Sequence, residues 1–187
     1  LGEINNTKYK NMKNSLSSTA AHSSLNIDDR NNIDLSGRRI TKISNIQFGK
    51  TKDGNLLDVT HSGYETIFGV HHKRQIYLSN KKNEIRGRDE ILNIGNIGSI
   101  PKNAYIRFHL CPGIELIKTR SGSILLNHQK GYVWKMSSNH KNISIENSVM
   151  FTPSGPKPCK GLSIILDLEK IRVYKSISCN WAFELQK

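Results

Sequence analysis

The chain has 187 residues, of which 36% are hydrophobic, and 28 Lys and Arg against 15 Asp and Glu give it a formal net charge of +13. This length suits one all-β domain, or at most two small ones. No apolar run is long enough for a membrane-spanning helix. Three cysteines without C-x-x-C spacing argue against a zinc cluster built from thiolates, and at most one disulfide could form.

The strong positive charge has two explanations, and the sequence leaves both open. A polyanion such as nucleic acid or an acidic polysaccharide would be attracted to it. Alternatively, the many Lys, Asn and Ile residues reflect the codons of an AT-rich genome, since the lysines are scattered rather than gathered in one block.

In chain order, the sequence begins with a polar stretch. Residues 1–17 lack hydrophobic periodicity, so we expect a loosely ordered entry segment. After it, short alternating runs follow one another, separated by turn residues such as Asp53-Gly54. The predicted strands are Ser23–Ile27, Ile40–Phe48 with a bulge, Asn55–His61, Arg74–Ser79, Ala104–Leu110, Ser123–Asn127, Gly131–Met136, Ile143–Phe151, Leu162–Leu168, Ile171–Tyr174 and Trp181–Leu185.

The spacing of these strands predicts the fold class. No segment has the apolar spacing of a long amphipathic helix, and the prolines of residues 153–158 are expected in a loop. Many short strands at regular spacing predict an all-β fold, a large antiparallel two-sheet β-sandwich without a substantial helix. We expect residues 18–187 to form this single domain.

Seven histidines are the first candidates for chemistry, and His22 has the most unusual setting. It follows two alanines and precedes Ser23-Ser24-Leu25, so small neighbours leave the imidazole open to close approach. His22, His61 or His72 with Asp28 could supply the three protein ligands of a catalytic zinc. No H-x-H or H-E-x-x-H spacing makes this set specific.

Strand alternation limits the other candidates. His71 and His72 are adjacent in a predicted strand and point to opposite faces, so they cannot both bind one metal. Tyr105, Arg107 and His109 share one face of their strand. That face is either an anion-binding groove or an ordinary solvated face of the sheet.

Several function classes lack their motifs. The chain contains no G-x-S-x-G, no G-x-x-x-x-G-K-[ST] and no G-x-G-x-x-G, and no cysteine lies in a recognisable catalytic motif. It also lacks the aromatic motif of RNA-recognition domains and a helix-turn-helix pattern, so we do not expect nucleic acid as a partner.

A series of short segments runs in order over most of the chain. The segments are Ser18-Thr19-Ala20-Ala21-His22-Ser23, His61-Ser62-Gly63-Tyr64, Phe68-Gly69-Val70 with His72 and Arg74, Tyr77-Leu78-Ser79 with Arg86-Gly87 and Asp89, Ile106-Arg107-Phe108-His109-Leu110 with Pro112, Gly131 with Trp134, Glu146 with Ser148-Val149, Gly155-Pro156 and Trp181-Ala182. In this order they resemble the C-terminal β-sandwich half of bacterial heparinase II/III-like proteins. Those proteins are polysaccharide lyases, or presumed lyases, with an N-terminal (α/α) toroid.

The resemblance implies a specific chemistry. Such lyases cleave acidic glycans by β-elimination, with a Tyr and a His as acid and base and a neutralising group for the enolate-like state. Zinc-containing members hold the metal in the β-sandwich through His, Asp and a later His, and the resemblance places His22 at that later His. The candidate substrate-binding residues are His61, Tyr64, His72, Arg74, Arg107 and His109.

The chain also departs from the family pattern. The upstream His-x-His-x-Asp and Asp-x-Gly elements are not among the 21 residues before His22, and the toroid with the catalytic Tyr is missing. Ser17 stands where members often have Arg, and Cys111 where His is common. We therefore expect a fragment that is a lyase by descent, with no catalytic residue of its own, inactive alone and without bound cofactor, whereas the intact family protein would carry zinc.

Partners and location follow from the same resemblance. The expected partners are an acidic polysaccharide and a separate toroid chain, in the periplasm or cell envelope by analogy with the family. The alternative, from a different class of function, is a non-catalytic basic module for glycan binding or interaction.

Overall fold

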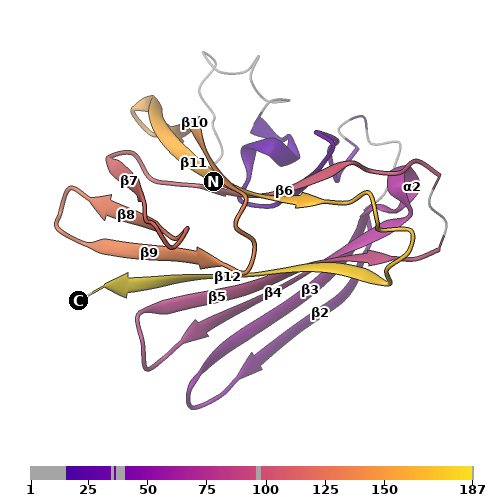
Figure 1. Cartoon of the computed structure of the whole chain (residues 1–187), viewed down its shortest axis with the longest axis horizontal. Helices are drawn as coiled ribbons and strands as arrows, with labels where there is room; N and C mark the ends of the chain where they lie inside the picture. Colours follow the sequence, from indigo (N-terminus) through magenta and orange to yellow (C-terminus); the bar gives the residue numbers. More distant parts are fainter. Residues whose placement is uncertain (1–15, 35, 37–40, 96–97, 187) are drawn as a thin grey trace.

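The computed structural model describes residues 16–34, 36, 41–95 and 98–186. Two antiparallel sheets of four and eight strands form a sandwich (Figure 1). The helix α2 (Glu65–Phe68) and the 3-10 turn η2 (Thr19–Ala21) are short. The prediction of an all-β, two-sheet antiparallel sandwich without a substantial helix is confirmed.

The two sheets differ in size. The smaller contains, in spatial order, β1 (Leu25–Ile27), β6 (Asn103–His109), β11 (Gly155–Asp167) and β10 (Ile143–Thr152). The larger contains β2 (Ile43–Lys50), β3 (Gly54–Tyr64), β4 (Val70–Ser79), β5 (Glu84–Asn93), β12 (Ser176–Gln186), β9 (Val133–Ser138), β8 (Ile124–His128) and β7 (Ile114–Lys118). Strand β2 therefore forms one edge of the larger sheet, and β7 forms the other.

The core lies between the sheets, and β6 shows why the sequence builds it. Ala104, Ile106 and Phe108 alternate with polar residues and are buried, as the pattern predicts. The ring of Phe108 lies 4.9 Å from that of Trp181 and 5.2 Å from that of Phe183, both on β12. Edge-on aromatic contacts thus join the smaller sheet to the larger one.

The acidic pair after β1, Asp28 and Asp29, forms a tight turn. Asp28 and Asp29 both have positive φ, 44° and 55°, and the N–H of Arg30 donates to the carbonyl of Ile27 at 2.9 Å. Two left-handed central residues are typical of a type I′ turn. The turn directs the Asp28 carboxylate towards Asn103. The backbone N–H of Asn103 donates a hydrogen bond to Asp28 Oδ1 at 2.9 Å.

Two other sequence features are confirmed. The pairing of β2 with β3 shifts register between Ile43 and Asn45, which is the expected bulge. The predicted hairpin turn at Asp53-Gly54 joins the same two strands, and the N–H of Thr51 donates to the carbonyl of Gly54.

Four local predictions were wrong. Strands β5 and β7 were not predicted, because β5 carries charged residues on both faces and β7 is short. Residues 153–158 were predicted as a loop, but β11 begins at Gly155. Before Gly161, β11 pairs with β10 alone, because its pairing with β6 starts at Gly161. Prolines are tolerated in this part of β11 because a residue without an N–H can face the side that has no partner strand. The predicted strand Ile171–Tyr174 is a turn held by hydrogen bonds to Leu168 and Lys170.

The remaining predictions concern the ends and the membrane. Of the expected entry segment, residues 1–17, the first 15 residues lie outside the described residues. Among the described residues, no helix is long and apolar enough to cross a membrane.

Candidate functional site

A buried carboxylate, Asp89 on β5, organises the polar residues of the larger sheet. Its Oδ1 accepts hydrogen bonds from His72 Nε2 at 2.6 Å and from Arg74 Nε at 2.7 Å, and its Oδ2 accepts from Trp181 Nε1 at 2.8 Å. Burial alone would raise the pKa of Asp89, but the bond from His72 and the charge of Arg74 hold it well below its usual range. Asp89 is therefore an ionised anchor with no exposed surface.

His61 and His72 extend this network as a directional chain. They lie directly opposite each other on β3 and β4, and His61 Nε2 is 3.0 Å from His72 Nδ1. The N–H of Gly63 donates to His61 Nδ1 at 3.1 Å, so the His61 proton is on Nε2 and points to His72. His72 Nδ1 then accepts, and its Nε2–H donates to Asp89. All four ring nitrogens are thus engaged in internal hydrogen bonds.

The environment keeps both imidazoles neutral near pH 7. Burial, with smaller effects from the charges of His72, His71 and Arg74, lowers the pKa of His61 to about 4. Burial also lowers the pKa of His72, although its bond to Asp89 acts in the opposite direction. The two faces predicted for the adjacent pair are present, because His72 is buried while His71 contacts Glu65 near the surface.

Tyr64 belongs to the core. It has no exposed surface, and its hydroxyl donates to the carbonyl of Leu25 at 2.9 Å. Burial raises the pKa of this phenol well above its usual value. Tyr64 therefore joins the end of β3 to β1, and its role in substrate binding stays a prediction.

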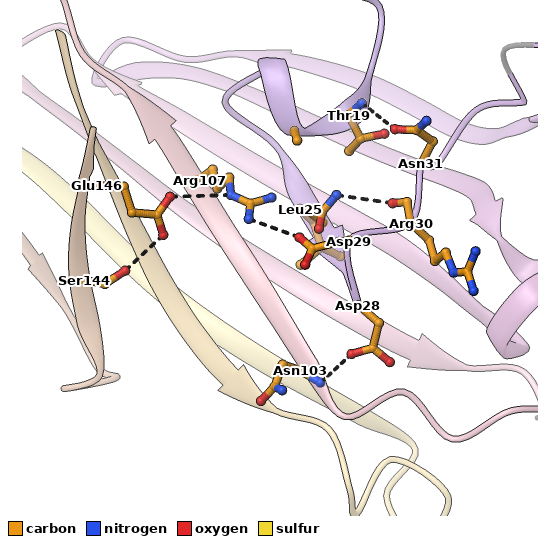
Figure 2. Close-up of polar contacts among 12 residues, drawn as sticks. Thr19, Leu25, Asp28, Asp29, Arg30, Asn31, Asn103, Arg107, Ser144 and Glu146 are labelled. Atoms are coloured by element: carbon orange, nitrogen blue, oxygen red, sulfur yellow. Dashed lines mark hydrogen bonds and ion pairs between the residues drawn. The ribbon is translucent and has the colours of Figure 1, made fainter. Parts of the chain in front are cut away.

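The segment that carries His22 is tied to both sheets. Arg74, held by Asp89, donates through Nη1 to the carbonyl of Ser23 at 2.6 Å. Thr19 donates through its N–H to Asn31 Oδ1 at 2.9 Å (Figure 2). His22 itself is half-buried. These contacts fix the backbone around His22, while the metal role of its ring stays a prediction.

A zinc site is not assembled by the part of the chain that the structure describes. In residues 16–34, 36, 41–95 and 98–186, no group of three or more His, Cys, Asp or Glu side chains is placed to hold a metal ion. Asp28 accepts backbone N–H groups, and His61 and His72 bond to each other. The described residues thus do not fit a complete zinc site around His22.

The predicted polar face of β6 forms a groove on the outside of the smaller sheet. Arg107 Nη2 lies 3.3 Å from Asp29 Oδ1, and Arg107 Nε lies 3.8 Å from Glu146 Oε2 (Figure 2). The guanidinium also lies over the ring of Tyr105, with its carbon 5.0 Å from the ring centroid. Arg107 is mostly buried, so two carboxylates and an aromatic ring hold it in one position.

His109 closes one side of this groove. Its Nε2 lies 3.0 Å from the carbonyl of Ala20 and donates to it, and its Nδ1 lies 2.8 Å from the hydroxyl of Ser148. Its backbone N–H donates to Ser23 Oγ at 3.0 Å. The segment before β1 is thereby attached to the groove at its Ala20 end.

The groove encloses a cavity of about 280 Å³. Its lining includes Arg107, His109, Glu146, Gly161 and Ser163. Two of its donors, Arg107 Nη1 and Ser163 Oγ, are buried without a hydrogen-bond partner. Such atoms are rare in native structures, and they point to a bound group or to water.

Sequence reasoning found one half of each cluster and missed the other half. It selected Arg107 and His109 as site residues. It named Glu146 only as part of the family resemblance and did not name Ser163, and both lie on strands distant in sequence. It selected His72 and Arg74 as site residues, but it named Asp89, their common acceptor, only as part of the family resemblance. An aspartate in an otherwise alternating strand was the available signal, because a buried carboxylate requires partners.

Comparisons with known proteins place this fold in a family. Residues 4–180 match the family model "Heparinase II/III-like, C-terminal". The solved structure of the heparinase III BT4657 gene product is similar with a TM-score of 0.69 at 11% identity, over 100% of this chain and 26% of that one. This chain thus spans about a quarter of the length of that heparinase III.

Other likenesses are more distant. The alpha-N-acetylgalactosaminidase NagBb from Bifidobacterium bifidum matches 87% of this chain with a TM-score of 0.48 and 9% identity, over 30% of its own length. The GH36 alpha-galactosidase AgaB from Geobacillus stearothermophilus matches 87% of this chain with a TM-score of 0.42 and 11% identity, over 29% of its own length. No curated protein sequence matches. The family match over residues 4–180 decides the assignment: the chain belongs to the heparinase II/III-like C-terminal family.

Proposed function

We propose that this chain is the C-terminal β-sandwich of a polysaccharide lyase that cleaves acidic glycans by β-elimination. The family match over residues 4–180 carries this proposal. The net charge of +13 supports an acidic substrate, because a strongly basic protein attracts polyanions over a distance set by the ionic strength.

The internal hydrogen bonds of Tyr64, His61 and His72 support a division of labour between this chain and a toroid. β-Elimination needs one group to remove a proton and another to donate one. The hydroxyl of Tyr64 is buried, and the nitrogens of His61 and His72 bond to each other, to Gly63 and to Asp89. These three side chains therefore stabilise the domain, and the acid and base would come from a toroid.

The edge of the larger sheet offers a surface for such a partner. Ile46, Phe48, Leu57 and Leu78 point to the same face at the β2 edge and are 66%, 70%, 36% and 47% exposed. Figure 1 shows β2 at the outer side of this sheet. Exposed apolar side chains on the edge strand β2 and on its neighbours β3 and β4 favour contact with a large partner.

The alternative function is a non-catalytic glycan-binding module. The cavity beside Arg107 favours it, since a cavity with unpaired donors can bind a ligand without any chemistry. Both functions predict binding to acidic glycans that weakens as salt rises. They differ only in whether a toroid makes the chain part of an enzyme.

The test is a cleavage assay followed by a binding assay. The purified chain alone is incubated with heparin, heparan sulfate or alginate, and the absorbance of unsaturated uronates is followed. We expect no product from the chain alone, and product when the toroid from the same source is added. Elution from immobilised heparin should need more salt than elution of a neutral β-sandwich of similar size. Turnover by the chain alone would contradict the division of labour, and salt-insensitive or absent binding would contradict the acidic substrate.

A further inference from the structure

The cavity beside Arg107 differs from a simple anion site in its charge. Arg107 is the positive group, but its Nη2 lies 3.3 Å from Asp29 and its Nε lies 3.8 Å from Glu146. One guanidinium thus faces two carboxylates. These three groups together carry one net negative charge, so they disfavour an incoming carboxylate or sulfate.

The unpaired atoms define what the cavity can bind. Arg107 Nη1 can only donate a hydrogen bond, whereas the hydroxyl of Ser163 can both donate and accept. The carboxylate of Glu146 only accepts, and it already receives the Ser144 hydroxyl at 3.1 Å (Figure 2). A ligand that fits this set must accept from Arg107 and donate to Glu146. Sugar hydroxyls do both, and a carboxylate cannot donate.

The register of the strands creates the space. Gly161 on β11 lies between Glu146 on β10 and His109 on β6. Because Gly161 has no side chain, the gap between these two residues stays open. A cavity of about 280 Å³ is far larger than the ~30 Å³ that one water occupies. Ser163, which is fully buried on the same strand, is one of its lining residues.

We propose that this cavity binds a neutral, hydroxyl-bearing sugar ring of the glycan, through a pair of hydroxyls held by Arg107, Ser163 and Glu146. The inference rests on the proposed function and names which part of the glycan this site recognises. The acidic groups of the glycan then meet basic residues outside the cavity. Binding in the cavity is insensitive to salt, while the attraction of the whole glycan is not.

The test compares two ligands that differ at one carbon. Methyl β-glucopyranoside carries a hydroxymethyl group where methyl β-glucuronide carries a carboxylate. The full chain is titrated with each, and amide NMR shifts are followed. We expect saturable shifts around Gly161 and Ser163 with the glucoside, unchanged between low and high salt, and binding of the glucuronide at least about tenfold weaker.

Two variants tie the binding to the cavity. Glu146→Gln removes the acceptor charge and should weaken binding of the glucoside about tenfold, which corresponds to loss of about one charge-assisted hydrogen bond. Gly161→Leu fills the space without removing a polar group, since a Cβ at 161 meets its nearest atoms at 3.5 and 3.8 Å. It should abolish the shifts. Glu115→Gln, an exposed change on β7, is the matched control and should bind like the wild-type chain.

Three results would overturn the inference: stronger binding of the glucuronide, no saturable shift with either sugar because the cavity holds only water, or full binding by the folded Gly161→Leu variant. The proposed function has a separate readout. If salt-dependent binding to heparin persists while the glucoside does not bind, the sugar site fails and the acidic-glycan function stands. If the wild-type chain binds neither heparin nor the glucoside, the proposed function itself fails.

Discussion

The buried histidine pair should make this domain sensitive to acid. The folded protein holds His61 with a pKa of about 4, whereas the unfolded chain takes up a proton near the ordinary value of 6.5. The stabilisation is therefore complete above pH 6.5 and is lost as the pH falls towards 4. At about 1.4 kcal/mol for each tenfold difference, the gap between these pKa values corresponds to about 3 kcal/mol, most of which is lost by pH 4.5.

The neighbours of His61 do not reverse this effect. The pKa of His72 is also lowered, so its protonation adds to the loss in the same direction. Asp89 titrates below its usual value of 3.8, so the stability that it contributes is retained above pH 3.8 and lost only below it. The window from pH 6.5 to pH 4.5 thus reports mainly on the histidine pair.

Urea unfolding followed by tryptophan fluorescence measures the effect, since Trp181 is buried in the core. Between pH 7.5 and 4.5 the wild-type chain should lose at least about 2 kcal/mol of unfolding free energy. His61→Gln keeps a polar side chain that takes up no proton, and should lose about 2 kcal/mol less over the same interval. His128→Gln, at the C-terminal end of β8, is the control and should behave as wild type. Equal unfolding free energies at both pH values, or an unchanged pH dependence in His61→Gln, would refute the reasoning.

Three further changes probe other contacts. Asp89→Asn should lower the unfolding free energy by about 3 kcal/mol or more in urea melts, because Arg74 would lose its buried ionised partner; wild-type stability would contradict the central place of Asp89. Gly87→Ala should destabilise by about 1–3 kcal/mol, since its Cβ would clash with the indole ring of Trp181. Gly161→Ala has room for its Cβ and should change thermal stability little. Cys111 is exposed, while burial raises the pKa of Cys179 to about 11, so iodoacetamide at pH 8 should label Cys111 and spare Cys179 in mass spectra of the folded chain; equal labelling would place Cys179 outside the core.

The fold class followed from local patterns because most strands carry their own signal. In β6, alternation alone separates buried Ile106 and Phe108 from the polar face of Arg107 and His109. The turn at Asp53-Gly54 followed from its composition in the same way. Strand β5 was not predicted because its inward face carries Asp89, and the burial of this residue depends on partners from β4 and β12.

The candidate site was harder to predict because register decides it. His61 faces His72 only because β3 and β4 pair in one particular alignment. Glu146 on β10 and Arg107 on β6 lie on either side of β11. They come close because the register places the small residues Gly161 and Ser163 of β11 between them. A single sequence contains no signal for such long-range alignment, whereas the residue types at each position could be selected from it.

The most direct measurement of the central claim is the rate of unsaturated uronate formation when a fixed amount of toroid from the same source is titrated with this chain. The proposed function predicts a rate that rises and saturates at a fixed ratio of the two chains, on an acidic glycan, and that falls with salt. A toroid rate that does not depend on this chain, over glycan concentrations that the chain demonstrably binds, would contradict a lyase function and leave a glycan-binding module.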